Sequence, residues 1–474
     1  MIDFDSIKRQ VKQRDLYIYK GKIERIVGMT IAATGPEGNI GDICKIYKNR
    51  GNSGGGTGGA SGIGGAGGAG SRNSIGGTGG ISSTGGSNSA VDSIYAEVVG
   101  ISGGKIMLMP YTDIEGIGPG SIVENTGDKL KVGVGKELVG RIINAIGQPL
   151  DDKDPPKTTH SYPIVGVPVN PLTRPRIDEI IPFGVKAIDG LLTIGKGQRI
   201  GIFAGSGVGK STLMGMIAKE VKADVNVIAL VGERGREVVE FIERDLGEKG
   251  MARSVLVVAT SDQPAMMRNK CPLTATAIAE YFKDQGLNVL LMMDSLTRFA
   301  MAQREIGLAT GEAPIARGYT PSIYTAMPKL LERAGNFDRG SITGVYTVLV
   351  EGDDTNEPIS DTVRGIIDGH IILSRKVAAR NHYPAIDILE SVSRLMVEIT
   401  DKDQQQTAAK MRNLLSVYYA NLDLVSIGAY KRGSNPKLDE ALRKIDKINA
   451  FLQQSINESF EYDETVKMLA EVIE

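Results

Sequence analysis

Arg199-Ile-Gly-Ile-Phe-Ala-Gly-Ser-Gly-Val-Gly-Lys-Ser-Thr212 contains the glycine-rich turn around which the rest of the chain is expected to be arranged. It predicts an apolar strand, a glycine-rich turn and the first turn of a helix. Gly205, Gly207 and Gly209 allow the backbone to curl until successive N–H groups point at one anion, and the helix adds its positive N-terminal end. The stretch therefore predicts a phosphate-binding loop, although Ala204 stands where the pattern G-x-x-x-x-G-K-[ST] has its first glycine.

The residues of this loop have expected roles toward a bound nucleotide. The Lys210 ammonium is expected to reach the β- and γ-phosphates, and the Ser211 hydroxyl to bind Mg²⁺. The strand-to-helix order makes a chance glycine-rich turn the weaker interpretation. The residues expected to surround the phosphates are Ala204, Gly205, Ser206, Gly207, Val208, Gly209, Lys210, Ser211 and Thr212.

The chain around the loop alternates apolar β-type runs with helical stretches. Near-continuous apolar strands between helices predict a mainly parallel sheet that is covered on both faces. In such a sheet the phosphate loop and any other site residues gather at the carboxyl ends of the strands. The runs are Arg199–Ala204, Val225–Val231, Ser254–Thr260, Val289–Met293, Gly344–Val350 and His370–Leu373.

Two carboxylates follow apolar runs and are candidates for the same edge. Asp294 ends one run, which is the form of a Mg²⁺ ligand, acting through water, opposite a phosphate loop; alone it reads equally well as a helix cap. Glu233 follows another run and can polarise a water for attack on the γ-phosphate, which makes it the candidate catalytic base. Its alternative is a salt bridge with Arg234 or Arg236.

Tyr383-Pro-Ala-Ile-Asp-Ile-Leu-Glu-Ser-Val-Ser-Arg394 lies just past the last apolar run. Tyr383 can stack on a base, and Arg394 can stabilise transition-state charge on a γ-phosphate as an arginine finger. The residues alone leave open whether Arg394 serves its own site or a neighbour's. The alternatives without a catalytic role are a packed side chain for Tyr383 and a surface ion pair for Arg394.

The N-terminal part has a different pattern of short β-type runs between glycine turns. Their close spacing predicts a small antiparallel barrel. Between two of the runs lies the stretch 51–90, in which 18 of 40 residues are glycine and Arg72 is the one charge, so a flexible surface insertion is expected. The runs are Gly21–Val27, Gly41–Ile46, Ala96–Gly100 and Lys105–Met109.

Both ends of the chain show helical spacing. Phe4, Ile7 and Val11 form a short amphipathic pattern, which fits a docking segment or a helix lying on its own domain. At the other end, Ala441, Ile445, Ile448 and Leu452 recur at helical spacing after the Asn435-Pro436 break and predict a helical domain. The expected domains are 1–15 (docking segment), 16–123 (barrel), 124–395 (nucleotide domain) and 396–474 (helical domain).

Composition narrows the class of protein. The 474 residues carry a net charge of −1, which gives no general field for nucleic acid. Cys44 and Cys271 form neither a metal pattern nor a disulfide framework, so a cytoplasmic compartment fits. The charges within Met1–Gln10 do not suit a secretory signal, and the apolar runs are too short to span a bilayer. Any contact with the inner face of the cytoplasmic membrane is therefore expected to be peripheral.

Four motifs together resemble the catalytic-subunit family of the rotary ATP synthases and type III secretion ATPases. They are Gly184-Val-Lys-Ala-Ile-Asp-Gly190, the phosphate loop, Val231-Gly-Glu-Arg234 and Pro384-Ala-Ile-Asp-Ile-Leu-Glu-Ser-Val-Ser393. The loop form and the tail Leu424–Asp439 look most like the flagellar protein-export branch. The resemblance spans nearly the whole chain apart from the stretch 51–90.

The resemblance implies a RecA-like P-loop domain between an N-terminal β-barrel and a C-terminal helical domain, assembled as a homohexamer. It implies a Mg²⁺-dependent ATPase that helps to release chaperones and deliver unfolded substrates for flagellar export. It assigns Arg234 to the phosphate environment, Tyr383 to the adenine and Arg394 to the adjacent subunit's site. The implied partners are a stator-like protein at the N-terminal segment, a central stalk-like protein, export chaperone–substrate complexes and the membrane export gate.

Four alternatives stay open. A virulence-type secretion ATPase or a rotary synthase subunit would keep the chemistry, and the Gly428–Pro436 tail disfavours the synthase. A ring-shaped nucleic-acid translocase shares the core, but the near-neutral charge and the lack of a basic-aromatic barrel face argue against it. A non-catalytic ring subunit would lack the Glu233 carboxylate.

Overall fold

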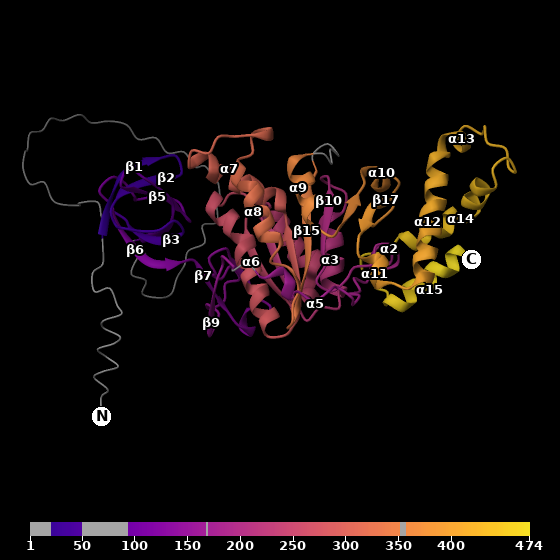
Figure 1. The fold of residues 1–474 in the computed structure, drawn as a ribbon, viewed down its shortest axis with the longest axis horizontal. Helices are drawn as coiled ribbons and strands as arrows, with labels where there is room; N and C mark the ends of the chain where they lie inside the picture. Colours follow the sequence, from indigo (N-terminus) through magenta and orange to yellow (C-terminus); the bar gives the residue numbers. More distant parts are fainter. Residues whose placement is uncertain (1–19, 50–92, 167–168, 351–356) are drawn as a thin grey trace, which may run out of the picture. The chain divides into compact units, whose positions relative to one another are not determined.

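The computed structural model describes residues 20–49, 93–166, 169–350 and 357–474 (Figure 1). The expected N-terminal docking segment and the glycine-rich stretch 51–90 lie outside these residues. The chain divides into two compact units, one of Met1–Val27 with Ile31–Gly127 and one of Gly28–Thr30 with Asp128–Glu474. The nucleotide-binding part and the C-terminal helices therefore belong to one unit.

The first unit contains a closed barrel with the strand order β1-β2-β5-β4-β3-β6. Apolar side chains alternate along its strands and fill the interior, among them Ile31, Cys44, Val98 and Leu108. The predicted antiparallel barrel is confirmed, but β2 and β6 were missed because one is short and the other is mostly polar. The strands are β1 (Lys20–Val27), β2 (Thr30–Thr34), β3 (Asp42–Tyr47), β4 (Ser93–Ser102), β5 (Lys105–Pro110) and β6 (Ile122–Lys129).

The second unit is built on a nine-stranded sheet with the order β17-β16-β10-β15-β13-β11-β12-β8, and β14 pairs with β15. Every pair of neighbouring strands from β16 through β8 along this path is parallel, whereas β17 runs antiparallel to β16 at one edge. The strands are β8 (Ile142–Asn144), β10 (Arg199–Ala204), β11 (Val225–Val231), β12 (Ser254–Ala259), β13 (Asn288–Asp294), β14 (Gly335–Asn336), β15 (Ser341–Leu349), β16 (Gly369–Leu373) and β17 (Ile386–Ser393).

The six predicted strands of this sheet are confirmed, because side chains buried on both faces give the continuous apolar runs that parallel strands show. The edge strand β17 was missed, since its buried residues alternate with exposed ones. Strand β8 was missed because only three residues form it.

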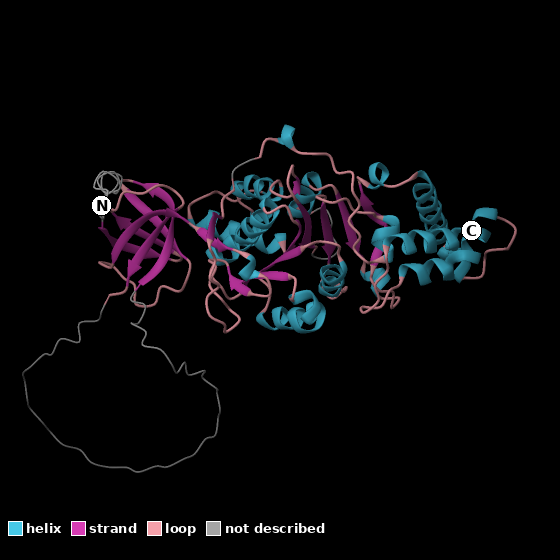
Figure 2. Cartoon of the chain, turned by 90° about the horizontal axis from the view of Figure 1, so that it is seen from below, coloured by secondary structure: helices cyan, strands magenta, loops and turns pink. Residues whose placement is uncertain are grey.

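Helices lie on both faces of the sheet (Figure 2). Their bounds are α2 (Lys186–Leu191), α3 (Lys210–Glu220), α4 (Gly235–Glu240), α5 (Gly247–Met251), α6 (Ala265–Asp284), α7 (Leu296–Ala309), α8 (Pro321–Leu331), α9 (Pro358–Ile366), α10 (Arg375–Ala378) and α11 (Met396–Ile399), with a π-helical turn at Phe241–Leu246. Short 3-10 turns occur at Lys136–Leu138, Pro171–Thr173 and Ala316–Gly318, and a separate ribbon pairs β7 (Lys131–Val134) with β9 (His160–Pro163). No helix in the described ranges combines the length and apolar character needed to cross a membrane.

The C-terminal helices are α12 (Lys402–Ala420), α13 (Leu422–Ser426), α14 (Pro436–Leu452) and α15 (Tyr462–Ile473). The four apolar residues predicted to share a helix face are all buried on α14. The Asn435 side chain accepts the N–H groups of Lys437 and Leu438, so the Asn-Pro break is the start of that helix. The predicted helical part is confirmed.

Buried amides join these helices to the nucleotide-binding part. Gln404 donates from Nε2 to the carbonyl oxygens of Asp189 and Gly190, and Gln454 pairs with the backbone of Gly184 and Lys186. Both glutamines are buried, so leaving these groups unpaired would cost about 1–3 kcal/mol each. The Gly184–Gly190 motif is thus the seam between the sheet and the helical part.

Packing of the loop helix α3 can be tested at Gly215. A Cβ there would lie 2.4 Å from the carbonyl oxygen of Asp245, which is backbone and cannot move aside. We expect Gly215→Ala to destabilise the protein by about 1–3 kcal/mol, measured as a lower thermal unfolding midpoint. Gly365→Ala on α9, where a Cβ meets nothing within 4 Å, is the matched control and should unfold no earlier than the parent. Equal midpoints for the two variants would contradict the packing.

Candidate active site

The phosphate loop connects the end of β10 at Ala204 to the start of α3 at Lys210. Gly207 and Gly209 have φ angles of +77° and +89°, the left-handed region that side chains other than glycine rarely adopt. The turn therefore depends on these two glycines, and Ala204 is accommodated as the last buried residue of the strand. The loop has the strand-to-helix geometry expected from the sequence.

A charged cluster forms at the carboxyl ends of the central strands. The Lys210 ammonium donates to Asp294 Oδ1 and lies 3.4 Å from Glu233 Oε1. The hydroxyl of Thr347 also donates to Asp294 Oδ1, at 2.7 Å. Lys210, Glu233 and Asp294, which we call the charged cluster, are 23 to 84 residues apart in sequence, and the parallel register of β10, β11 and β13 brings them together.

Burial sets the electrostatics of this cluster. It raises the pKa of Glu233 to about 7, and the nearby Asp294 carboxylate adds to the shift, while Lys210 and Arg298 oppose it. Burial alone would lower the pKa of Lys210, but attraction to Asp294 and Glu233 outweighs it and the pKa is raised. A carboxylate whose pKa is near neutrality can take a proton from an attacking water, as a general base must.

The structure excludes the purely structural roles considered for the two carboxylates, a helix cap for Asp294 and a salt bridge to Arg234 or Arg236 for Glu233. Ser295, not Asp294, caps α7, because the Ser295 side chain accepts the N–H of Arg298. Arg234 pairs with Glu237 at 3.1 Å and Arg236 pairs with Glu240 at 2.7 Å, so the predicted alternative of a salt bridge to Glu233 is wrong. The Arg234 side chain is 77% exposed and lies outside the charged cluster.

Arg298 is a further residue at this site, and the sequence analysis missed it. It lies on α7, and a Cβ on Gly232 would lie 3.1 Å from its Cβ, so it packs under the turn that carries Glu233. Its Nε is buried and has no hydrogen-bond partner among the described residues. The signal available in the sequence was its position one helical turn after Asp294.

The donor chemistry fits Mg²⁺. Mg²⁺ is usually held by one or two carboxylates, a hydroxyl and substrate phosphates rather than by a full protein cage. The described residues contain no cluster of three or more histidine, cysteine or acidic side chains able to hold a metal ion. Ser211 is the second residue of α3, directly after Lys210, and Asp294 points at the Lys210 ammonium, so a hydroxyl and a carboxylate are available beside the loop.

A cavity of about 1010 Å³ lies between the loop helix and the C-terminal part. Tyr383 lines it and stands beside the loop, because a Cβ on Gly209 would be 3.6 Å from its ring. The tyrosine is 43% exposed, which excludes the packed alternative. The lining also includes residues that the sequence did not indicate, namely Lys186, Gln453, Ile456 and Phe460. The volume suits a nucleoside.

Arg394 lies at the amino ends of the parallel strands, opposite the end that carries the phosphate loop. Strand β17 runs antiparallel to β16 and pairs Ser393 with Gly369, so Arg394 follows at the amino ends of β16 and β10. The arginine is exposed, and its guanidinium donates to the carbonyl oxygen of Arg364 at 3.2 Å. No carboxylate in the described part of the chain forms an ion pair with Arg394. Within that part, the alternative of a surface ion pair for Arg394 is therefore wrong.

Comparison with known protein families gives three matches along the chain. The model for the ATP synthase alpha/beta family, nucleotide-binding domain, matches residues 184–393. The beta-barrel domain of the same family matches residues 84–127, and the T3SS EscN ATPase C-terminal domain matches residues 400–471.

Individual relatives cover nearly the whole chain. The flagellum-specific ATP synthase of Bacillus subtilis (strain 168) is 51% identical over 97% of this chain and 96% of its own. The type 3 secretion system ATPase of Sinorhizobium fredii is 43% identical over 97% and 94%. The solved structure of the assembled ATPase EscN from the type III secretion system of enteropathogenic E. coli has a TM-score of 0.83 at 42% identity, covering 96% of this chain and all of EscN. EscN in complex with its central stalk EscO has a TM-score of 0.81 at 41% identity, over the same shares of the two chains.

The raised pKa of Glu233 predicts a pH-dependent effect on stability. Above pH 7 the ionised carboxylate is held in an unfavourable site, at a cost of about 3 kcal/mol relative to the unfolded chain. Below pH 4.5 the group is protonated in both states and this cost vanishes. We therefore expect Glu233→Gln to raise the unfolding midpoint at pH 8, with a gain that shrinks as the pH falls from 7 toward 4.5.

Thermal unfolding of the nucleotide-free protein between pH 8 and pH 5 measures this gain. Glu240→Gln is the control, because Glu240 is an exposed carboxylate of the same segment that pairs with Arg236. A Glu233→Gln midpoint no higher than the parent's at pH 8 would show that the cluster does not disfavour the charge.

Proposed function

The chain belongs to the ATP synthase alpha/beta family, and from this membership we propose that it is the ATPase that energises type III protein export in flagellar assembly. The observation that carries the chemistry is the convergence of Lys210, Glu233 and Asp294 at the mouth of the phosphate loop. The reaction is hydrolysis of ATP to ADP and phosphate. The flagellum-specific relatives at 51% and 52% identity support the flagellar assignment.

Each member of the site has one proposed task. The loop N–H groups and the Lys210 ammonium bind the β- and γ-phosphates and offset their charge. Glu233 orients a water toward the γ-phosphate and accepts its proton, which its pKa near 7 permits. Ser211 and, through water, Asp294 would hold Mg²⁺, which supplies charge neutralisation between the phosphates. Tyr383 and the cavity beside it would take the adenine.

The position of Arg394 supports a site shared between subunits. Strand β10 has six residues, so its two ends are about 20 Å apart, and Arg394 stands at the end opposite the loop. That separation is too long for Arg394 to serve its own nucleotide. Val392 and Val397, which lie within three residues of it in sequence, are exposed apolar residues, which is typical of a face that another copy covers. We therefore place Arg394 in the neighbour's site within a homohexamer.

The other partners follow from the relatives and from the family resemblance. The complex of EscN with its central stalk EscO supports a stalk-like partner for this chain. Chaperone–substrate complexes, a stator-like protein at the N-terminal segment and peripheral contact with a membrane export gate complete the proposal. The proposed location is the cytoplasm at the inner face of the membrane, with no role for nucleic acid.

A virulence-type secretion ATPase is the second candidate. The type 3 secretion system ATPase of Xanthomonas euvesicatoria is 50% identical over 80% of this chain, close to the flagellar relatives. Deleting the gene and scoring flagellar filaments would separate the two candidates. A rotary synthase subunit is disfavoured, because the C-terminal residues 400–471 match the secretion ATPase domain.

Loss of the base should abolish turnover. We expect Glu233→Gln to lower the rate of ATP hydrolysis at least 100-fold while nucleotide binding is retained, since general base catalysis contributes about 10²–10⁴-fold. Steady-state phosphate release and binding of a fluorescent nucleotide measure the two properties, with Glu240→Gln as the control. A Glu233→Gln variant that hydrolyses ATP at near the parent rate would remove Glu233 as the base.

Mixing experiments should reveal the shared site. Arg394→Ala and Lys210→Ala subunits are each expected to retain only a small residual activity alone, and mixed assemblies should regain part of the lost activity, because some interfaces combine an intact loop with an intact arginine. Hydrolysis is followed against the mixing ratio, and mass determination confirms that mixed assemblies form. Mixed assemblies without any recovered activity would count against Arg394 acting between subunits.

A further inference from the structure

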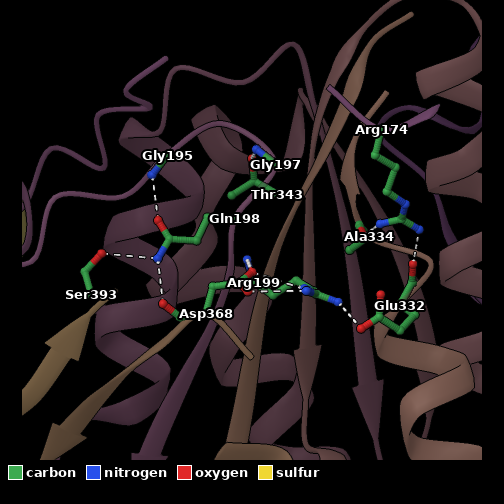
Figure 3. Close-up of polar contacts among 10 residues, drawn as sticks. All are labelled: Arg174, Gly195, Gly197, Gln198, Arg199, Glu332, Ala334, Thr343, Asp368 and Ser393. Atoms are coloured by element: carbon green, nitrogen blue, oxygen red, sulfur yellow. Dashed lines mark hydrogen bonds and ion pairs between the residues drawn. The ribbon is translucent and has the colours of Figure 1, made fainter. Parts of the chain in front are cut away.

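The buried amide of Gln198 lies at the amino ends of the parallel strands, at the end of β10 opposite the phosphate loop. Figure 3 shows its polar contacts. Gln198 precedes β10 and is 0% exposed. Its Nε2 donates to the carbonyl oxygen of Asp368 and to Ser393 Oγ, both at 3.2 Å, and its Oε1 accepts the N–H of Gly195 at 2.8 Å. Both donor hydrogens and the carbonyl oxygen of this amide therefore have partners, although nothing in the charged cluster touches it.

The partners of Gln198 are the residues that carry Arg394. Ser393 directly precedes Arg394, and its hydroxyl donates to the carbonyl oxygen of Thr193 at 2.9 Å. The Asp368 carbonyl oxygen, besides accepting the Gln198 amide, accepts the backbone N–H of Arg394 at 3.0 Å. The backbone before and at Arg394 is therefore tied to the turn that starts β10.

An ion-pair network holds Asp368 from the other side. Arg199 donates to the Asp368 carboxylate from its backbone N–H and its Nε, both at 3.1 Å, and from Nη2 at 3.3 Å. Arg199 also pairs with Glu332 at 2.6 Å. Hydrogen bonds to charged groups are stronger than those between neutral groups, so these three bonds fix Asp368 to the first residue of β10. The carbonyl that receives the Arg394 N–H thus has a defined position.

The contrast with the Arg394 side chain is informative. The guanidinium is exposed and makes one hydrogen bond within the described part of the chain, to a carbonyl oxygen of α9, whereas the backbone next to it is held by buried groups. A catalytic side chain needs this arrangement, in which the backbone is fixed and the charged group is free to contact a ligand. A displacement of about 1 Å can cost up to about 100-fold in rate.

We propose that Gln198 and Ser393 are positioning residues that fix Arg394 to the amino end of β10, so that the strand that carries a subunit's own phosphate loop also places the arginine offered to its neighbour. This inference rests on the proposed role of Arg394 and adds how the chain holds it. Neither residue touches the nucleotide, and both act through the Arg394 backbone.

Ser393→Ala tests the proposal with little risk to folding, since the Asp368 contacts remain. We expect kcat for ATP hydrolysis by the assembled protein to fall 3- to 10-fold, with KM for ATP, the unfolding midpoint and the assembly mass near the parent values. Ser393→Thr keeps the hydroxyl and should restore kcat. Ser391→Ala is the matched control, because Ser391 lies on the same strand and also makes two hydrogen bonds, to Asp387 and Ile372.

A double-mutant cycle with Arg394→Ala separates positioning from general damage. If Ser393 acts through Arg394, adding Ser393→Ala to Arg394→Ala should cost nothing further. A Ser393→Ala enzyme with the kcat of Ser391→Ala, or a full further loss in the Arg394→Ala background, would overturn the positioning role. Full activity of assembled Arg394→Ala would instead overturn the proposed role of Arg394, and the positioning role with it.

Discussion

The site depends on one largely buried cation, the Lys210 ammonium, held between two carboxylates. Burial alone would lower the pKa of this lysine, and the two carboxylates would repel each other without it. The three groups come from the ends of strands whose pairing is fixed by long runs of apolar side chains. The hydrophobic core therefore sets the geometry, and the charges fit the space at its edge.

Much of this could be predicted from the sequence. Parallel strands buried on both faces give continuous apolar runs that can be recognised in the sequence without knowing which strands pair. Because the carboxyl ends of parallel strands meet at one end of the sheet, the residues that follow these runs, such as Glu233 and Asp294, are expected to lie together. What sequence could not supply were features that depend on the edge strand β17. Its alternating pattern hides it, and without it the side of the sheet on which Arg394 emerges cannot be deduced. Arg298 and Phe460 were missed for a related reason, since each gains its meaning only from the turn or cavity it faces.

The cavity beside the phosphate loop also shows why the C-terminal helices belong to the same unit as the sheet. Its lining combines Gly209 of the loop and Tyr383 with Gln453 and Phe460 of the C-terminal part. Gln454 also lines it and is hydrogen-bonded to the backbone of Gly184 and Lys186. A ligand in the cavity would therefore touch the loop and the helical part at once. The helical part is the segment that matches the T3SS EscN ATPase C-terminal domain, so a ligand bound at the loop would also contact that domain.

The separation of the loop and Arg394 on opposite ends of β10 has a consequence for counting sites. If Arg394 serves the neighbour's site, as proposed, an open row of identical subunits has at one end a loop that no arginine reaches and at the other end an arginine that meets no loop. A row of subunits is thus always one complete site short of its number of chains. Closing the row into a ring joins the two unmatched ends in a single step. Ring closure would therefore add one complete catalytic site as well as one more subunit interface.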